Sequence, residues 1–116
     1  MKLIFRILAL AVAGVLIDIP WLFGTSAWSG EVIRSIQGSP LELSMAPAIV
    51  VYIAIAYLVT ITTSPLQAFT TGLATYAIYD FTNLATLKKY PLAFALADST
   101  WGGVLFTALH YVNQYI

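Results

Sequence analysis

Long apolar runs, separated by short polar connections, fill most of this 116-residue chain. Four of the runs are about twenty residues long, enough for a helix rising 1.5 Å per residue to cross a bilayer core of roughly 30 Å. The predicted helices cover residues 3–23, 40–63, 65–87 and 91–112. We therefore predict an all-α, polytopic membrane protein whose four transmembrane helices form an antiparallel bundle. Residues 1–116 would make a single integral membrane domain.

Proline and serine mark three of the predicted helix starts. Ser39–Glu42 and Ser64–Gln67 each place serine at the N-cap, proline at the first helical position, and Glu or Gln at the third. Pro91 opens the last helix in a similar way, and Pro47 is expected to kink the second helix. We expect the second helix to be scaffolding or to face lipid, because it carries no charge beyond Glu42.

The first apolar run and the polar connection after it each allow two interpretations. A basic start and small-residue patterns also describe a signal peptide, but the run continues as far as Trp21, so we expect it to be retained as a helix. Within the connection, Ser29–Gln37 fits either a short helix lying in the membrane interface or an ordinary loop. The apolar side of that helix would hold Trp28, Val32, Ile33 and Ile36.

Composition favours a protein surrounded by lipid. Hydrophobic residues make up 60% of the chain and charged residues 9%, against about 45–50% and 25% in soluble domains. The net charge of zero, without a basic stripe, argues against a nucleic-acid partner. No cysteine and no catalytic or phosphate-binding motif is present, so we predict no cofactor, no metal site and no catalytic residue. A protein that is not an enzyme is favoured over a carboxylate enzyme acting on lipid.

Three aspartates interrupt the apolar segments. An ionisable side chain at membrane depth costs roughly 2.5–3.5 kcal/mol even on the most lenient scale, so it needs a partner or a function. Asp18 lies near the end of the first helix, Asp80 near the end of the third, and Asp98 near the start of the fourth. Because neighbouring helices alternate in direction, all three should lie near the same membrane face, about 7–11 Å from a helix end.

Polar and aromatic residues accompany these acids at helical spacing. Trp21 follows Asp18, Asn83 follows Asp80 and Trp101 follows Asp98 by three residues each, so each pair shares a helix face. Tyr76, four residues before Asp80, lies on the same face as that aspartate. The predicted site consists of Asp18, Asp80, Asp98, Asn83, Tyr76, Tyr79, Trp21 and Trp101.

Small residues near the acids predict close contact between helices. Ala68 and Gly72 form a small-x-x-x-small pair on the third helix, and Gly14 and Gly102 lie on the faces that carry Asp18 and Asp98. His110, the single histidine, is expected at the membrane interface rather than as a metal ligand.

Two functions fit this cluster. In the first, a membrane protein binds or transports an ion, a proton or a small polar solute through the acids. The alternative is an accessory or structural subunit in which the same residues are packing glue between helices. In either case we expect a lipid bilayer around the chain, and a homo-oligomer, most simply a dimer, or a partner membrane subunit. Basic residues are divided too evenly between the two ends to assign an orientation or a particular membrane.

Three segments carry a resemblance to a known family. They are Tyr-x-x-Tyr-Asp-x-Thr-Asn-x-Ala-Thr at residues 76–86, Asp-x-x-Trp-Gly at residues 98–102 and Asp-x-x-Trp-Leu at residues 18–22. With them the chain resembles a family of small bacterial predicted membrane proteins that contain a domain of unknown function. The resemblance implies a membrane fold of four helices and no established activity.

Overall fold

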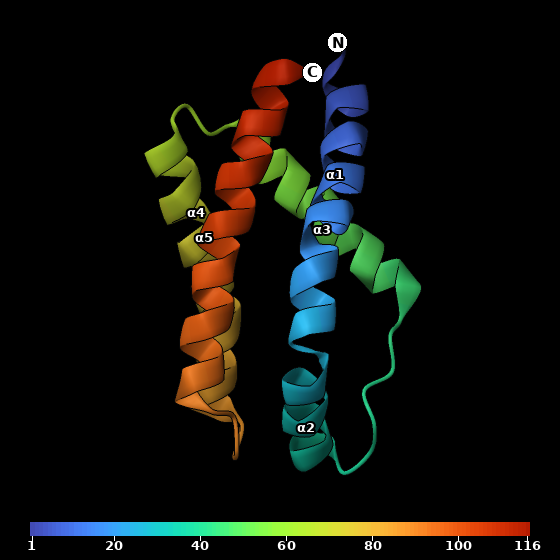
Figure 1. Ribbon diagram of the computed structural model, residues 1–116, viewed down its shortest axis with the longest axis vertical. Coiled ribbons are helices and arrows are strands. Elements are labelled where there is room, and N and C mark those ends of the chain that lie inside the picture. The colour runs from blue at the N-terminus through green and yellow to red at the C-terminus, as the bar shows by residue number, and fades with distance from the viewer.

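The computed structural model describes residues 1–116 as five α-helices without a strand, so the prediction of an all-α protein is confirmed (Figure 1). The helices are α1 (Leu3–Gly24), α2 (Ser26–Gln37), α3 (Met45–Thr60), α4 (Pro65–Thr86) and α5 (Leu92–Tyr115).

Two of the helices, α1 and α5, are long and apolar enough to cross a membrane. The apolar helix α3 has 16 residues and is therefore about 24 Å long, shorter than the bilayer core. The 22 residues of α4 give it sufficient length, but its threonine, tyrosine and amide side chains make it less apolar than the two candidate spans. A bundle with four membrane spans therefore stays a prediction.

The helices alternate in direction around α5. Its antiparallel partner is α4, and α1 packs against both α5 and α3. In Figure 1, α3 crosses obliquely behind α1, and α2 continues beyond the end of α1 at the bottom of the view. The two chain termini lie together at the opposite end, where Arg6 on α1 donates hydrogen bonds to the carbonyl and side-chain oxygens of Asn113 on α5.

The predicted start of the second long helix is wrong. The helix begins at Met45 instead of Pro40, and neither Ser39 nor its actual N-cap residue forms a side-chain cap. The reason is that Ser26–Gln37 is already a helix, which ends at left-handed Gly38, so an extended segment must follow before α3 can start. Pro47 consequently lies in the first turn of α3, where a missing N–H costs nothing, and it does not kink the helix interior.

The predicted starts of the other helices agree more closely with the structure. Ser64 caps α4, accepting a hydrogen bond from the backbone N–H of Gln67, as the capping pattern predicts. The last helix begins one residue after Pro91. The helical alternative for residues 29–37 is confirmed, and α2 starts three residues earlier, at Ser26.

Glycines bring α4 and α5 unusually close together. A Cβ atom built on Gly72 would lie 2.6 Å from Cγ of Phe106, and one built on Gly102 would lie 2.6 Å from Cβ of Tyr76. A Cβ atom on Gly103 would meet the ring of Phe69 at 2.7 Å. The predicted small-residue contact at Gly72 and Gly102 is thus confirmed, and it places Tyr76 of α4 directly on the backbone of α5.

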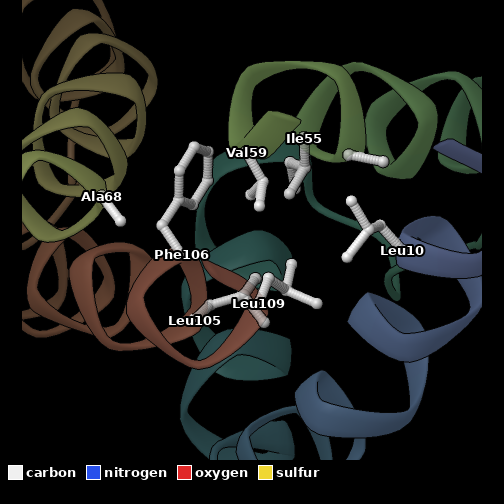
Figure 2. Close-up of a cluster of buried hydrophobic side chains, with 8 residues drawn as sticks. Leu10, Ile55, Val59, Ala68, Leu105, Phe106 and Leu109 are labelled. Atoms are coloured by element: carbon white, nitrogen blue, oxygen red, sulfur yellow. The ribbon is translucent and has the colours of Figure 1, made fainter. Parts of the chain in front are cut away.

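An apolar layer fills the middle of the molecule (Figure 2). Side chains from all four long helices converge there, namely Leu10, Ile55, Val59, Ala68, Leu105, Phe106 and Leu109. Two polar layers flank it. On α3, Tyr52 precedes the residues of the apolar layer, and Thr62 follows them just past the helix end. On α5, Asp98 precedes the residues of the apolar layer, and His110 follows them. The aspartates and the histidine therefore lie on opposite sides of the core.

Candidate functional site

Asp18 joins three helices through two hydrogen bonds. Its carboxyl group, on α1, accepts a bond from the hydroxyl of Tyr52 on α3 at 2.5 Å and another from Nε1 of Trp101 on α5 at 2.7 Å. The side chain is only 5% exposed. Both of its oxygens have a donor, so Asp18 is fully paired without any basic residue.

The two tryptophans of the predicted site exchange partners between helices. Trp101 follows Asp98 in sequence but donates its N–H to Asp18. Trp21 follows Asp18 in sequence but lies beside the carboxyl group of Asp98. The two indoles stack nearly parallel, with 5.3 Å between their centroids. This stack connects α1 to α5 at the level of the acids.

Asp80 is the most deeply buried acid, with no exposed surface. One of its carboxyl oxygens accepts a hydrogen bond from the hydroxyl of Tyr90 at 2.6 Å. The other accepts a longer bond, 3.4 Å, from the hydroxyl of Ser99 on α5. Tyr90 is therefore the stronger of its two neutral partners.

Tyr90 comes from the short loop between α4 and α5 and turns inward. It is 7% exposed, and the amide of Asn83 lies near its hydroxyl. Burial, followed by the hydrogen bond to Asp80, raises the pKa of Tyr90 above its usual range. The phenol consequently stays protonated at physiological pH and remains a donor to Asp80.

Asp98 connects the two hydrogen-bonded groups. Its carboxyl group lies beside that of Asp80 and is close enough to Asp18 for their charges to interact. The hydroxyl of Tyr76 lies among the same acids and interacts with the charges of Asp18, Asp98 and Asp80. The structure therefore brings the three predicted aspartates together in one cluster, which we call the aspartate cluster.

No basic side chain balances the aspartate cluster. Arg6 is bonded to Asn113 at the other end of the molecule, and the four remaining Lys and Arg side chains are exposed. The groups that act on the charge of Asp98 are two other acids and an indole. No group of three or more His, Cys, Asp or Glu side chains is arranged to hold a metal ion. The carboxyl groups are thus neutralised neither by ion pairs nor by a ready metal site.

One predicted site residue lies outside the cluster. Tyr79 is 59% exposed on the outer face of α4, because it precedes Asp80 by one residue and so points about 100° away from it. Asn83 lies near the hydroxyl of Tyr90, the hydrogen-bond partner of Asp80. Tyr76, Trp21 and Trp101 lie within it, as predicted.

Three hydrogen-bond donors to the acids were not predicted from sequence. Tyr52 lies on α3, the helix that was expected to be scaffolding or to face lipid and from which no partner of the acids was predicted. Its spacing from buried Ile55 and Val59, three and seven residues later, would have placed it on the core-facing side. Tyr90 and Ser99 gave no comparable signal, because a loop direction and a single serine on α5 carry no periodicity.

His110 is not an interfacial residue, contrary to the prediction. It is buried, with Nδ1 2.8 Å from the Thr62 hydroxyl and Nε2 3.2 Å from the amide nitrogen of Gln114. The Thr62 hydroxyl already donates to the Val59 carbonyl, so it accepts the Nδ1 proton. Nε2 then accepts from Gln114. These bonds make His110 a connection between α5 and the end of α3.

Comparison with known protein families matches residues 3–114 to the family described as "Predicted membrane protein (DUF2177)". The match extends from the first residue of α1 to the last turn of α5. Neither the curated proteins nor the solved structures gave a match to this chain.

Proposed function

We propose, from the premise that the chain belongs to the DUF2177 family of predicted membrane proteins, that it is a multi-pass protein binding protons reversibly in the membrane. In this proposal α1, α3, α4 and α5 all span the bilayer. The aspartate cluster takes up and releases the protons, and Asp80 and Asp98 hold the exchangeable one.

The observation that carries the proposal is a fully buried Asp80 that is hydrogen-bonded only by the neutral hydroxyls of Tyr90 and Ser99, with Asp98 nearby and no basic partner. Two adjacent carboxylates repel each other, and sharing one proton relieves this repulsion. Acids inside a membrane commonly mark proton relays or ion pathways. The Asp80–Asp98 pair has the composition of such a proton site.

A proton fits this site better than a metal ion. Calcium takes six to eight oxygen ligands, and magnesium demands an octahedral shell. The chain offers no group of three acidic or histidine side chains with that arrangement. Tyr52, Tyr90, Trp101 and Ser99 contribute hydroxyl and N–H donors, which suit carboxyl groups rather than a cation.

The apolar layer limits how protons could move. Leu105, Phe106 and Leu109 separate the aspartate cluster from the polar groups at the opposite end of α5. Proton transfer across the whole membrane would require this layer to open. We therefore expect slow, gated transfer and no open-channel conductance.

Replacing Asp98 by Asn tests the proposal. Asn keeps the size of the side chain and donates a hydrogen bond to Asp80, but it removes the shared proton. We expect the Asp98→Asn protein in liposomes to lose proton flux by about tenfold or more, since general acid–base groups contribute on the order of 10²–10⁴ to proton transfer. The measurement is the decay of an imposed pH gradient, reported by a trapped dye.

Glu42→Gln is the matched control, because Glu42 is an exposed carboxylate in the segment between α2 and α3. It should leave the flux unchanged. Equal flux from Asp98→Asn and the unmodified protein would contradict a proton site at this pair, and so would a metal requirement for flux.

The structural role is a second candidate, and the pairing of Asp18 supports it. Asp18 has both oxygens satisfied by neutral donors from α3 and α5, which is what packing glue requires. We propose that Asp18 anchors the helices while Asp80 and Asp98 exchange the proton.

We also propose a homodimer, because α4 packs mainly on α5 and leaves its outer face uncovered. A monomeric mass in mild detergent would contradict the dimer.

A further inference from the structure

Asp80 lies near the end of α4 but has no exposed area. It is six residues before the last residue of α4, or about 9 Å along the helix. The next three residues, Leu87, Lys88 and Lys89, are exposed. The loop between α4 and α5 is therefore the exposed segment of chain that follows Asp80 most closely.

Tyr90 turns inward from this loop. It is the only residue of Leu87–Tyr90 that is buried, and its hydroxyl reaches the carboxyl group of Asp80 at 2.6 Å. Its ring stands edge-to-face on Phe94 in the first turn of α5, with 5.9 Å between the centroids. One phenol thus joins the loop to the acid behind it.

The helix α2 covers Tyr90 from outside. Val32 of α2 is buried in a small apolar cluster with Tyr90 and Ala95, separate from the main core. Trp28 of α2 stands edge-to-face on Phe94, with 5.0 Å between the centroids. These contacts seal the end of the molecule at which α2 lies in Figure 1.

The loop is held in a strained conformation. Lys89 has a φ of +69°, in the left-handed region that is unfavourable for residues other than Gly, Asn or Asp. The strained residue directly precedes Tyr90 in the chain. The hydrogen bond and the ring contacts of Tyr90 therefore hold its phenol in the inward position. Such strain persists only where the surrounding contacts hold it in place.

We infer that the loop Leu87–Pro91 is a gate between Asp80 and water, with the Tyr90 hydroxyl as its latch and α2 as its cover. The purpose of the gate, to control proton exchange at Asp80, rests on the proposed function, whereas the geometry of the gate does not. Tyr90 is a positioning residue here, because it acts through access to Asp80.

The absence of cysteine from the chain allows a direct test of access. Ser99 is 3% exposed and bonds to Asp80, so a Ser99→Cys variant reports whether a small, membrane-impermeant thiosulfonate reagent reaches the site behind the gate. In proteoliposomes we expect this thiol to react slowly. Adding Tyr90→Phe should speed the reaction about tenfold, the change expected from losing one strong hydrogen bond while the ring contacts stay.

Two further variants separate a latch from general loosening. Tyr79→Phe removes a phenol hydroxyl from an exposed position on α4 and should leave the rate unchanged. Lys89→Asn suits the left-handed conformation, so it should favour the closed loop and slow the reaction by about two- to fivefold. Exposed Thr86→Cys provides the rate of an open thiol.

Three results would overturn the gate. They are a Ser99→Cys thiol that already reacts as fast as Thr86→Cys, a thiol that stays unreactive with Tyr90→Phe, and an equal acceleration by Tyr79→Phe. The thiol reports access and not proton binding. A loss of the latch effect therefore refutes the gate alone, whereas unchanged proton flux in Asp98→Asn refutes the proposed function alone.

Discussion

Adding one methyl group at Gly72 is expected to destabilise the folded protein by about 1–3 kcal/mol, the usual cost of overpacking a close contact. The new Cβ would lie 2.6 Å from Cγ of Phe106 and would also overlap the carbonyl oxygen of Gly102. Neither neighbour is the free end of a flexible side chain, so α4 and α5 must separate. The loss should appear as a lower midpoint when Gly72→Ala is unfolded in mixed detergent micelles and followed by circular dichroism.

Gly14→Ala is the matched control for this prediction. Gly14 is also buried inside a long helix, but a Cβ there would meet Leu109 and Tyr52 at 3.5 Å, an ordinary contact distance. Alanine should therefore be neutral or should stabilise the helix by about 0.5–1 kcal/mol. Equal effects of Gly72→Ala and Gly14→Ala would mean that α4 and α5 do not pack through Gly72.

Replacing Asp18 by Leu should cost about 2–4 kcal/mol. The change leaves the hydroxyl of Tyr52 and Nε1–H of Trp101, both half-buried, without an acceptor, and each unsatisfied donor costs about 1–2 kcal/mol. Because these donors come from α3 and α5, the variant should lose contacts between three helices. Thermal unfolding in detergent measures the loss, and tryptophan fluorescence reports the surroundings of Trp101.

Asp18→Asn distinguishes the hydrogen bonds from the charge. The amide oxygen can accept from Trp101 and the amide nitrogen can donate to the Tyr52 oxygen, so we expect a cost below about 1 kcal/mol. A large loss in Asp18→Asn would show that Asp18 works as a charge rather than as an anchor. Equal stability of Asp18→Leu and the unmodified protein would contradict the three-helix connection.

Helix positions could be predicted from the sequence wherever a local pattern determines them. The cap at Ser64 is determined by four consecutive residues, and the apolar runs of α1 and α5 are recognised from their length and hydropathy. The start of α3 failed because the same serine–proline pattern at Ser39 competes with α2, which ends at left-handed Gly38 immediately before it. A capping pattern cannot report a competing helix on its N-terminal side.

The aspartate cluster could be predicted in its location but not in its connections. Helix direction and spacing were sufficient to bring Asp18, Asp80 and Asp98 together. The hydrogen bonds depend on which faces meet across helices. Trp101 therefore bonds to Asp18 rather than to its neighbour in sequence, and Tyr90 comes from a loop whose path carries no sequence period. The spacing of Tyr52 places it on the core-facing side of α3 but does not tell which acid it meets.

Infrared difference spectroscopy during a pH titration tests most directly whether the Asp80–Asp98 pair holds an exchangeable proton. The C=O stretch of a protonated carboxyl group absorbs at a frequency separate from the bands of carboxylates. This band shifts when the proton is replaced by deuterium. We predict such a band in the folded protein in liposomes, retained in Glu42→Gln and lost in Asp98→Asn. If the unmodified protein shows only ionised carboxylates, or if Asp98→Asn keeps the band unchanged, the pair does not hold the proton.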